Sequence, residues 1–168
     1  MYKKILVMGV SGSGKTRIGE ELAERLGLDF FDGDDYHSAG NVKKMACGIP
    51  LTDEDRFGWL KTLNQLVKSN SGLVIACSAL TTAYRELLID GNPELKVIYL
   101  KGSFRTIWSR LNKRTDHYFH GEQMLVSQFN TLVEPSASEA IIVDIEQSAK
   151  QVVNEILETV AKDAAEQP

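Results

Sequence analysis

Residues 9–16 contain the most specific chemical motif of the sequence, which fits the pattern G-x-x-x-x-G-K-[ST] in full. They are Gly9, Val10, Ser11, Gly12, Ser13, Gly14, Lys15 and Thr16. Glycines at this spacing let the backbone curl so that successive N–H groups point at phosphate oxygens. In this pattern the lysine reaches the β- and γ-phosphates, and the threonine hydroxyl binds Mg²⁺. We therefore expect residues 9–16 to bind ATP and Mg²⁺, with Lys15 taking part in catalysis and Thr16 binding the metal.

Two carboxylates follow an apolar run at residues 28–31. Asp32 and Asp34 differ by two positions, so in an extended chain they lie on one face. The carboxyl end of a strand beside the phosphate loop lies close to the transferring phosphoryl group. We expect Asp34 to accept the proton of an attacking hydroxyl, and Asp32 to orient the Mg²⁺ shell through water. A solvated acidic turn is the alternative for this segment, with the Asp34 side chain forming an Asx turn.

Apolar runs predict the elements that position these residues. Five of them indicate buried strands, at residues 5–8, 28–31, 73–76, 97–100 and 141–143. The runs are continuous rather than alternating, which is typical of a parallel sheet covered on both faces. Helical patterns separate them, so we predict an α/β fold with a doubly wound, five-stranded parallel sheet flanked by helices.

Three helices show a clear apolar face. The first ends at Leu26, with Gly27 as its expected cap. The second begins at a possible capping box formed by Thr52 and Asp55. Its apolar face consists of Phe57, Leu60, Leu63 and Val67. The last covers residues 152–160. Two polar stretches, 33–53 and 114–121, interrupt the alternation and are the expected ligand-binding insertions.

Length and composition suit one domain, residues 1–168. Hydrophobic residues make up 43% of the chain and charged residues 25%, which is ordinary globular usage. The formal net charge of −4 argues against nucleic acid and membrane surfaces as partners. Cys47 and Cys77 do not form a disulfide framework or a zinc site, and we expect both to be buried as small apolar side chains. No apolar stretch could span a bilayer, so we expect a cytoplasmic protein.

A GTPase switch is the main competitor from another class. The segment 55–58 matches D-x-x-G, but it lies inside a predicted helix rather than after a strand. The segment 112–115 resembles the guanine-reading N-K-x-D and lacks the final aspartate. A small-molecule kinase explains more of the pattern, and a nonenzymatic nucleotide-dependent regulator is the remaining alternative.

Beyond the phosphate loop, the chain resembles the gluconate kinase family over nearly its whole length. The matching segments, in order, are 32–34, His37, Asn41, 44–45, 48–56, 59–60, 77–80, 84–85, His117, Phe119, 127–129, 131–132 and 134–135. The family is similar in fold to shikimate and nucleoside-monophosphate kinases. The resemblance implies a substrate-binding region at about 33–60 and a lid at about 114–126. It implies transfer of phosphate from ATP to the 6-hydroxyl of D-gluconate, often by a homodimer. Another aldonate or a shikimate-like acceptor is the alternative.

The resemblance also indicates roles for the remaining site residues. Asp34, His37, Arg56 and Ser78 are expected to bind the sugar acid, with the Arg56 guanidinium on its carboxylate. The alternative for Arg56 is an exposed helix arginine paired with Asp53 or Asp55. Arg114 is the expected catalytic cation of the lid, and Arg110, four residues earlier, is expected to bind the nucleotide. Ser38 stands where the family usually has proline, and we expect Trp59 and Trp108 to be packing residues.

Overall fold

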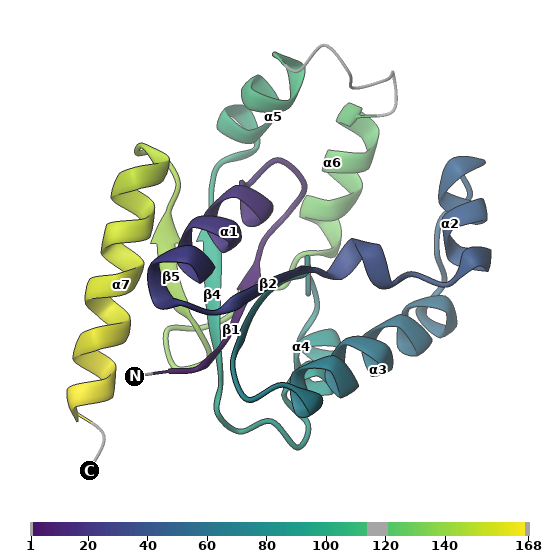
Figure 1. The fold of residues 1–168 in the computed structure, drawn as a ribbon. Helices are drawn as coiled ribbons and strands as arrows, with labels where there is room; N and C mark the ends of the chain where they lie inside the picture. The colour runs from purple at the N-terminus through teal and green to yellow at the C-terminus, as the bar shows by residue number, and fades with distance from the viewer. Residues whose placement is uncertain (1, 114–120, 167–168) are drawn as a thin grey trace.

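The computed structural model describes residues 2–113 and 121–166 of the chain, which form an α/β fold (Figure 1). The elements follow in the order β1 (Lys4–Met8), α1 (Lys15–Leu26), β2 (Asp29–Asp32), a 3-10 helix η1 (Gly33–Tyr36), α2 (Ala39–Ala46), α3 (Asp53–Ser69), β3 (Leu73–Ala76), α4 (Thr82–Ile89), β4 (Leu95–Lys101), α5 (Phe104–Asn112), α6 (Gly121–Thr131), β5 (Ile141–Asp144) and α7 (Ala149–Glu166). The five strands pair in parallel in the order β2-β3-β1-β4-β5. The predicted doubly wound parallel sheet is therefore confirmed.

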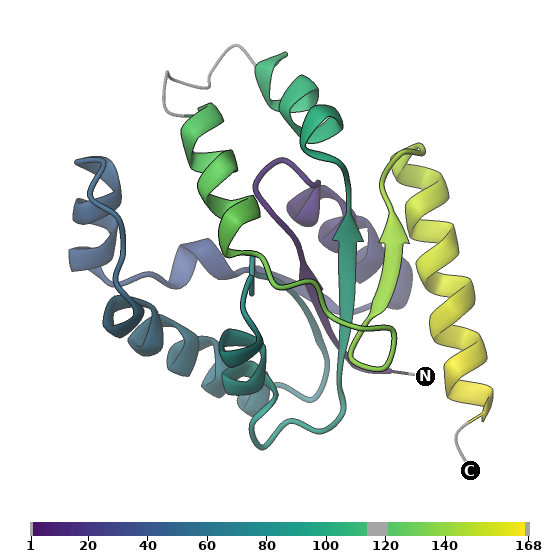
Figure 2. The same cartoon turned by 180° about the vertical axis from the view of Figure 1, so that it is seen from behind.

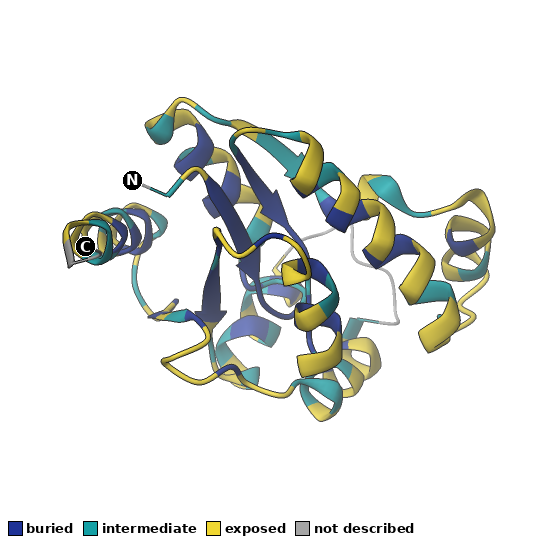
Figure 3. Cartoon of the chain, turned by 90° about the horizontal axis from the view of Figure 1, so that it is seen from below, coloured by how far each residue is buried: buried dark blue, intermediate teal, exposed yellow. Residues whose placement is uncertain are grey.

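Both faces of the sheet are covered by apolar side chains. Along β1, Ile5 and Val7 pack into one buried cluster with α1 and α7. Leu6 and Met8 point the other way, into a cluster with α3 and α4. Figure 2 shows the fold from behind, and Figure 3 shows the buried strands between the helical layers. Full burial on two faces is why the strands appear as continuous apolar runs in the sequence.

Local capping signals were accurate guides to helix ends. Gly27 ends α1 in the left-handed conformation, with φ of 66°. Thr52 and Asp55 form the predicted capping box at the start of α3. β2 begins at Asp29, one residue later than predicted, and β4 extends to residues 95–101.

Two burial predictions were wrong, and both concern the segment between β2 and β3. Phe57 is 42% exposed, whereas Leu60, Leu63 and Val67 are buried. The amino-terminal turns of α3 project past the sheet together with α2 (Figure 1), so the apolar face of α3 meets the core only from Trp59 onward. Cys47 is exposed because it ends α2 at the tip of this projection, whereas Cys77 is buried as predicted. We call α2, α3 and their connection, residues 39–69, the α2–α3 arm.

Among the described residues, no helix has the length and apolarity needed to cross a membrane.

Candidate active site

The predicted phosphate loop connects β1 to α1. Gly12 and Gly14 have φ of 79° and 95°, in the left-handed region where side chains with a Cβ are strained. These conformations curl the loop around the amino-terminal end of α1. The hydroxyl of Ser13 is buried in the loop and has no hydrogen-bond partner among the described residues. The loop thus combines the backbone curl, the helix end and a free buried hydroxyl that suit bound phosphate.

Lys15 is the first residue of α1, and its ammonium group turns back over the loop. Its Nζ donates a hydrogen bond to the Val10 carbonyl oxygen at 3.0 Å. Burial lowers the pKa of Lys15, and the nearby negative charges of Asp34 and Asp32 oppose that shift. Those charges favour the ammonium form, so the cation lies where an anionic ligand would meet it.

The end of β2 brings both predicted carboxylates to the loop. Asp32 accepts a hydrogen bond from the Thr16 hydroxyl through Oδ2 at 3.0 Å, and from the Asp34 N–H through Oδ1 at 3.0 Å. Gly33 makes this approach possible, because a Cβ at that position would lie 2.5 Å from the Ala76 carbonyl oxygen. One carboxylate therefore connects the proposed metal-binding hydroxyl to the backbone of the proposed base.

A cavity of about 220 Å³ opens between the loop and these carboxylates, and Lys15, Thr16, Asp32, Asp34 and Cys77 line it. The Asp34 side chain is 80% exposed to the open cavity. The cavity walls still remove part of its hydration, which raises the pKa of the Asp34 carboxyl. The charge of Asp32 raises that pKa further, while Lys15 opposes it. A carboxylate with a raised pKa is a stronger base than an ordinary aspartate.

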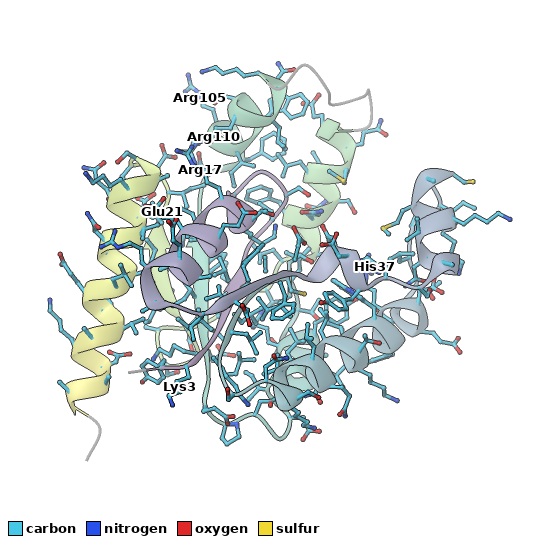
Figure 4. All side chains as sticks on the ribbon, viewed as in Figure 1. Lys3, Arg17, Glu21, His37, Arg105 and Arg110 are labelled. Carbon is cyan, nitrogen blue, oxygen red and sulfur yellow. The ribbon has the colours of Figure 1, made fainter. Side chains whose placement is uncertain are left out.

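His37 lies between η1 and α2 (Figure 4). Its side chain is 5% exposed, and its Nε2 lies 4.0 Å from Asp34 Oδ1. The ring stacks on Trp59, with centroids 4.1 Å apart, and Nδ1 lies 3.4 Å from the Asn41 side-chain nitrogen. Burial lowers the pKa of His37. The imidazole is therefore neutral at neutral pH and suited to hydrogen bonding rather than to charge pairing.

Trp59 is buried, as a packing residue should be, but it also holds the site together. Its Nε1 donates a hydrogen bond to the Gly33 carbonyl oxygen at 2.7 Å. The same indole carries the stacked ring of His37. One side chain of α3 therefore fixes both the segment that carries Asp34 and the orientation of His37.

Arg56 lies in the first turns of α3, and it pairs with neither of the two carboxylates that the alternative assigned to it. Asp55 binds the Lys44 ammonium group, with 2.8 Å between Oδ2 and Nζ. Asp53 accepts a hydrogen bond from the Tyr84 hydroxyl instead. None of the ion pairs formed by the described residues includes Arg56. The alternative of a helix arginine paired with its own acidic neighbours is therefore wrong.

The acceptor side of the site ends at the turn after β3. Ser78 is half-buried, and the next residue, Ala79, adopts φ of 47° in the left-handed region. A non-glycine residue in this region stores strain that its surroundings must compensate. Arg85 helps to do so, because its Nη1 donates to the Ala79 carbonyl oxygen at 3.0 Å.

Comparison with known proteins agrees with this geometry. The thermoresistant gluconokinase of Escherichia coli (strain K12) is 47% identical over 94% of this chain and 93% of its own length. The probable gluconokinase of Mus musculus is 42% identical over 92% and 95%. The chain belongs to the gluconokinase family. A solved gluconokinase from Sinorhizobium meliloti 1021 superposes with a TM-score of 0.90 at 38% identity, covering 98% of this chain and 94% of that one.

The gluconokinase family shares its fold with a wider group. The family model described as shikimate kinase matches residues 11–161. A shikimate kinase structure from Acinetobacter baumannii, at 22% identity, superposes with a TM-score of 0.64 and shows the common fold alone.

The predicted lid cations have different outcomes in this gluconokinase-family chain. Arg114 and residues 114–120 of the predicted lid lie outside the described residues. Arg110 is half-buried on α5, and its Nη2 donates to the Ile145 carbonyl oxygen just after β5. This bond ties the end of α5 to the β5–α7 connection.

Sequence reasoning missed one residue that contacts the phosphate loop directly. Gln128 of α6 accepts a hydrogen bond from the Ser11 N–H through Oε1 at 2.7 Å, and its Nε2 donates to the Ser11 hydroxyl at 3.3 Å. The two residues are 117 positions apart, so no local pattern connects them. The only signal was that Gln128 lies within the segment 127–129 of the family resemblance.

Proposed function

We propose that this chain transfers the γ-phosphoryl group of ATP to the 6-hydroxyl of D-gluconate, giving 6-phosphogluconate and ADP. The observation that carries the proposal is one cavity in which Lys15 and Thr16 of the phosphate loop face Asp34. Relatives named gluconokinase, 37% to 47% identical over most of the chain, support gluconate as the acceptor. Arg56, which has no carboxylate partner among the described residues, suits a sugar acid.

The residues of the loop fit Mg-ATP. The backbone N–H groups of residues 12–16 and the Lys15 ammonium would hold the phosphates, and the Thr16 hydroxyl would bind the metal. Asp32 already holds that hydroxyl and would orient the metal's water shell. When bound, Mg²⁺ neutralises charge on the β- and γ-phosphates. Within the described residues, no group of three or more histidine, cysteine, aspartate and glutamate side chains could hold a metal ion.

Asp34 would orient the 6-hydroxyl and accept its proton as the oxygen attacks phosphorus. His37 and Ser78 would hydrogen-bond other hydroxyls of the sugar acid. Arg56 would hold the carboxylate at the far end through paired N–H donors. This arrangement fixes both ends of a short open chain, so that its last hydroxyl lies beside Asp34.

Arg114 in the lid and Arg110 before it would add positive charge as the phosphoryl group transfers. The proposal also includes a homodimer, which the family resemblance implies, and the cytoplasmic location expected from the sequence. Sedimentation of the purified chain tests the first of these, and a single monomeric species would refute it.

The decisive experiment measures ADP production with Mg-ATP and a panel of acceptors. The panel contains D-gluconate, other aldonates, shikimate and nucleoside monophosphates. Asp34→Ala should abolish gluconate-dependent turnover without preventing ATP binding, whereas Asp35→Ala, an exposed neighbour, should keep most of it. Turnover with another aldonate would change the substrate and keep the mechanism. A folded protein that binds ATP but shows no acceptor-dependent turnover would refute the kinase proposal and favour a regulator.

A further inference from the structure

The hydroxyl of Tyr84 lies between Arg56 and Asp53. It accepts a hydrogen bond from Arg56 Nη1 at 3.2 Å and donates one to Asp53 Oδ1 at 2.6 Å. We propose that Tyr84 is a positioning residue that keeps the Arg56 guanidinium apart from Asp53, and so available to the carboxylate of an acid substrate. This inference rests on the proposed function, because it explains how that site would select an acid.

The spacing along α3 shows what Tyr84 prevents. Asp53 and Arg56 are three residues apart, a separation at which opposite charges on a helix normally attract each other. The nearby Asp55 is already bound to Lys44 and to the Thr52 N–H. Asp53 is therefore the acidic neighbour most able to capture Arg56, and the inserted hydroxyl satisfies it instead.

Tyr84 is built to stay in this place. It comes from the first turn of α4, whose cap Thr81 accepts the Tyr84 N–H, and it is 8% exposed. The Arg56 Cζ lies 5.8 Å from the centroid of the Tyr84 ring, within reach of a cation–π attraction. Burial, and then the hydrogen bond to Asp53, raise the pKa of the Tyr84 phenol. The hydroxyl therefore keeps its proton for Asp53 while its oxygen accepts from Arg56.

Within the described part of the chain, the Arg56 guanidinium keeps N–H donors that are available to a ligand. A guanidinium carries five N–H donors, and Tyr84 takes one. The neutral Tyr84 hydroxyl holds the Arg56 side chain in position without neutralising its charge. A direct ion pair with Asp53 would hold the side chain and also neutralise its charge. The remaining donors can form a paired contact with a carboxylate, which a ligand without a carboxylate cannot use.

Tyr84→Phe removes only the oxygen and keeps the ring. We expect the gluconate KM to rise about 10-fold, because a charged hydrogen-bond network is lost and Asp53 can now bind Arg56 directly. The KM for ATP should stay at the wild-type value. Tyr99→Phe is the matched control, since Tyr99 is also buried and its hydroxyl contacts Glu134 rather than the site. Its gluconate KM should not change.

A second variant separates positioning from packing. Adding Asp53→Asn to Tyr84→Phe removes the carboxylate that would capture Arg56, so the gluconate KM should fall back toward the wild-type value. A packing defect would not be repaired by that change. Thermal unfolding followed by circular dichroism shows that each variant is folded.

The outcomes are distinct. The role of Tyr84 is overturned if Tyr84→Phe has the wild-type gluconate KM, or if the gluconate KM of the double variant is no lower than that of Tyr84→Phe. In either case, gluconate turnover by the wild type still upholds the proposed function. A folded wild-type protein without gluconate turnover overturns the proposed function and this inference with it.

Discussion

Replacing Gln128 with alanine should weaken nucleotide binding, whatever the acceptor. The change removes the hydrogen bond from the Ser11 N–H at 2.7 Å and the longer one to the Ser11 hydroxyl at 3.3 Å. A hydrogen bond of this kind contributes a net ~0.5–1.5 kcal/mol. Counting the longer bond at the lower end, the phosphate loop loses about 1–2 kcal/mol of restraint. If that restraint holds the loop ready for phosphate, the Kd for Mg-ATP rises by about 5–30-fold.

Isothermal titration with a non-hydrolysable ATP analogue measures this effect directly. Asn130→Ala is the matched control, because Asn130 is exposed on the same helix, lies outside the predicted lid and also loses a side-chain amide. Gln128→Glu keeps an acceptor for the Ser11 N–H but adds negative charge beside the phosphates, so it should bind the analogue more weakly than Gln128→Ala. A wild-type Kd in Gln128→Ala, with the fold intact, would show that the bond does not prepare the loop.

Three further predictions concern the acceptor side of the site. The proposed base, Asp34, can accept a proton only when it is ionised, so kcat/KM should fall as pH decreases through the raised pKa of this carboxyl. The fall should occur at a higher pH than for an aspartate with an ordinary pKa. A profile that stays flat down to pH 4 would exclude Asp34 as the base. Gly33→Ala should lower the free energy of unfolding by about 1–3 kcal/mol because its Cβ would meet the Ala76 carbonyl. Gly58→Ala, whose Cβ would meet nothing within 4 Å, should instead raise the free energy of unfolding by about 0.5–1 kcal/mol. Urea denaturation checks both variants, and equal effects would refute the steric reason. Trp59→Phe should cost about 1–3 kcal/mol in the same assay, since it leaves the buried Gly33 carbonyl without its donor, and an unchanged midpoint would contradict this.

The parts of the structure that could be predicted are those set by neighbours in the chain. The phosphate loop needs only a strand, a curl of glycines and a helix in sequence, and all three are contiguous. The Thr52 capping box and the Gly27 cap likewise depend on residues four or fewer positions apart. Burial of β1 on both faces appears directly as a continuous apolar run. For such features the sequence pattern and the structure express the same local chemistry.

Helical spacing, by contrast, shows which side chains share a face but not how far that face follows the sheet. Phe57 shares its face with Leu60, yet only Leu60 reaches the core. The contacts of Gln128 with Ser11, and of Tyr84 with Asp53, join segments that are distant in the sequence. Neither pair could be found without knowing how α6 and α4 pack.

The two halves of the site are therefore held by different means. The proposed nucleotide half comes mostly from contiguous residues 9–16. The proposed acceptor half depends on the α2–α3 arm, where Trp59 binds Gly33, Lys44 binds Asp55, and Asn41 donates to the Asp55 carbonyl.

Ser38 illustrates how this second half adapts. The Ser38 hydroxyl accepts a hydrogen bond from the Asn41 N–H and so caps α2. Asn41 in turn contacts His37 and the Asp55 carbonyl, so the cap supports His37, one of the residues proposed to bind the acceptor. A change in the arm can thus move the acceptor contacts while the phosphate loop stays as it is. We therefore expect the acceptor preference of this chain to depend on the polar contacts of the arm.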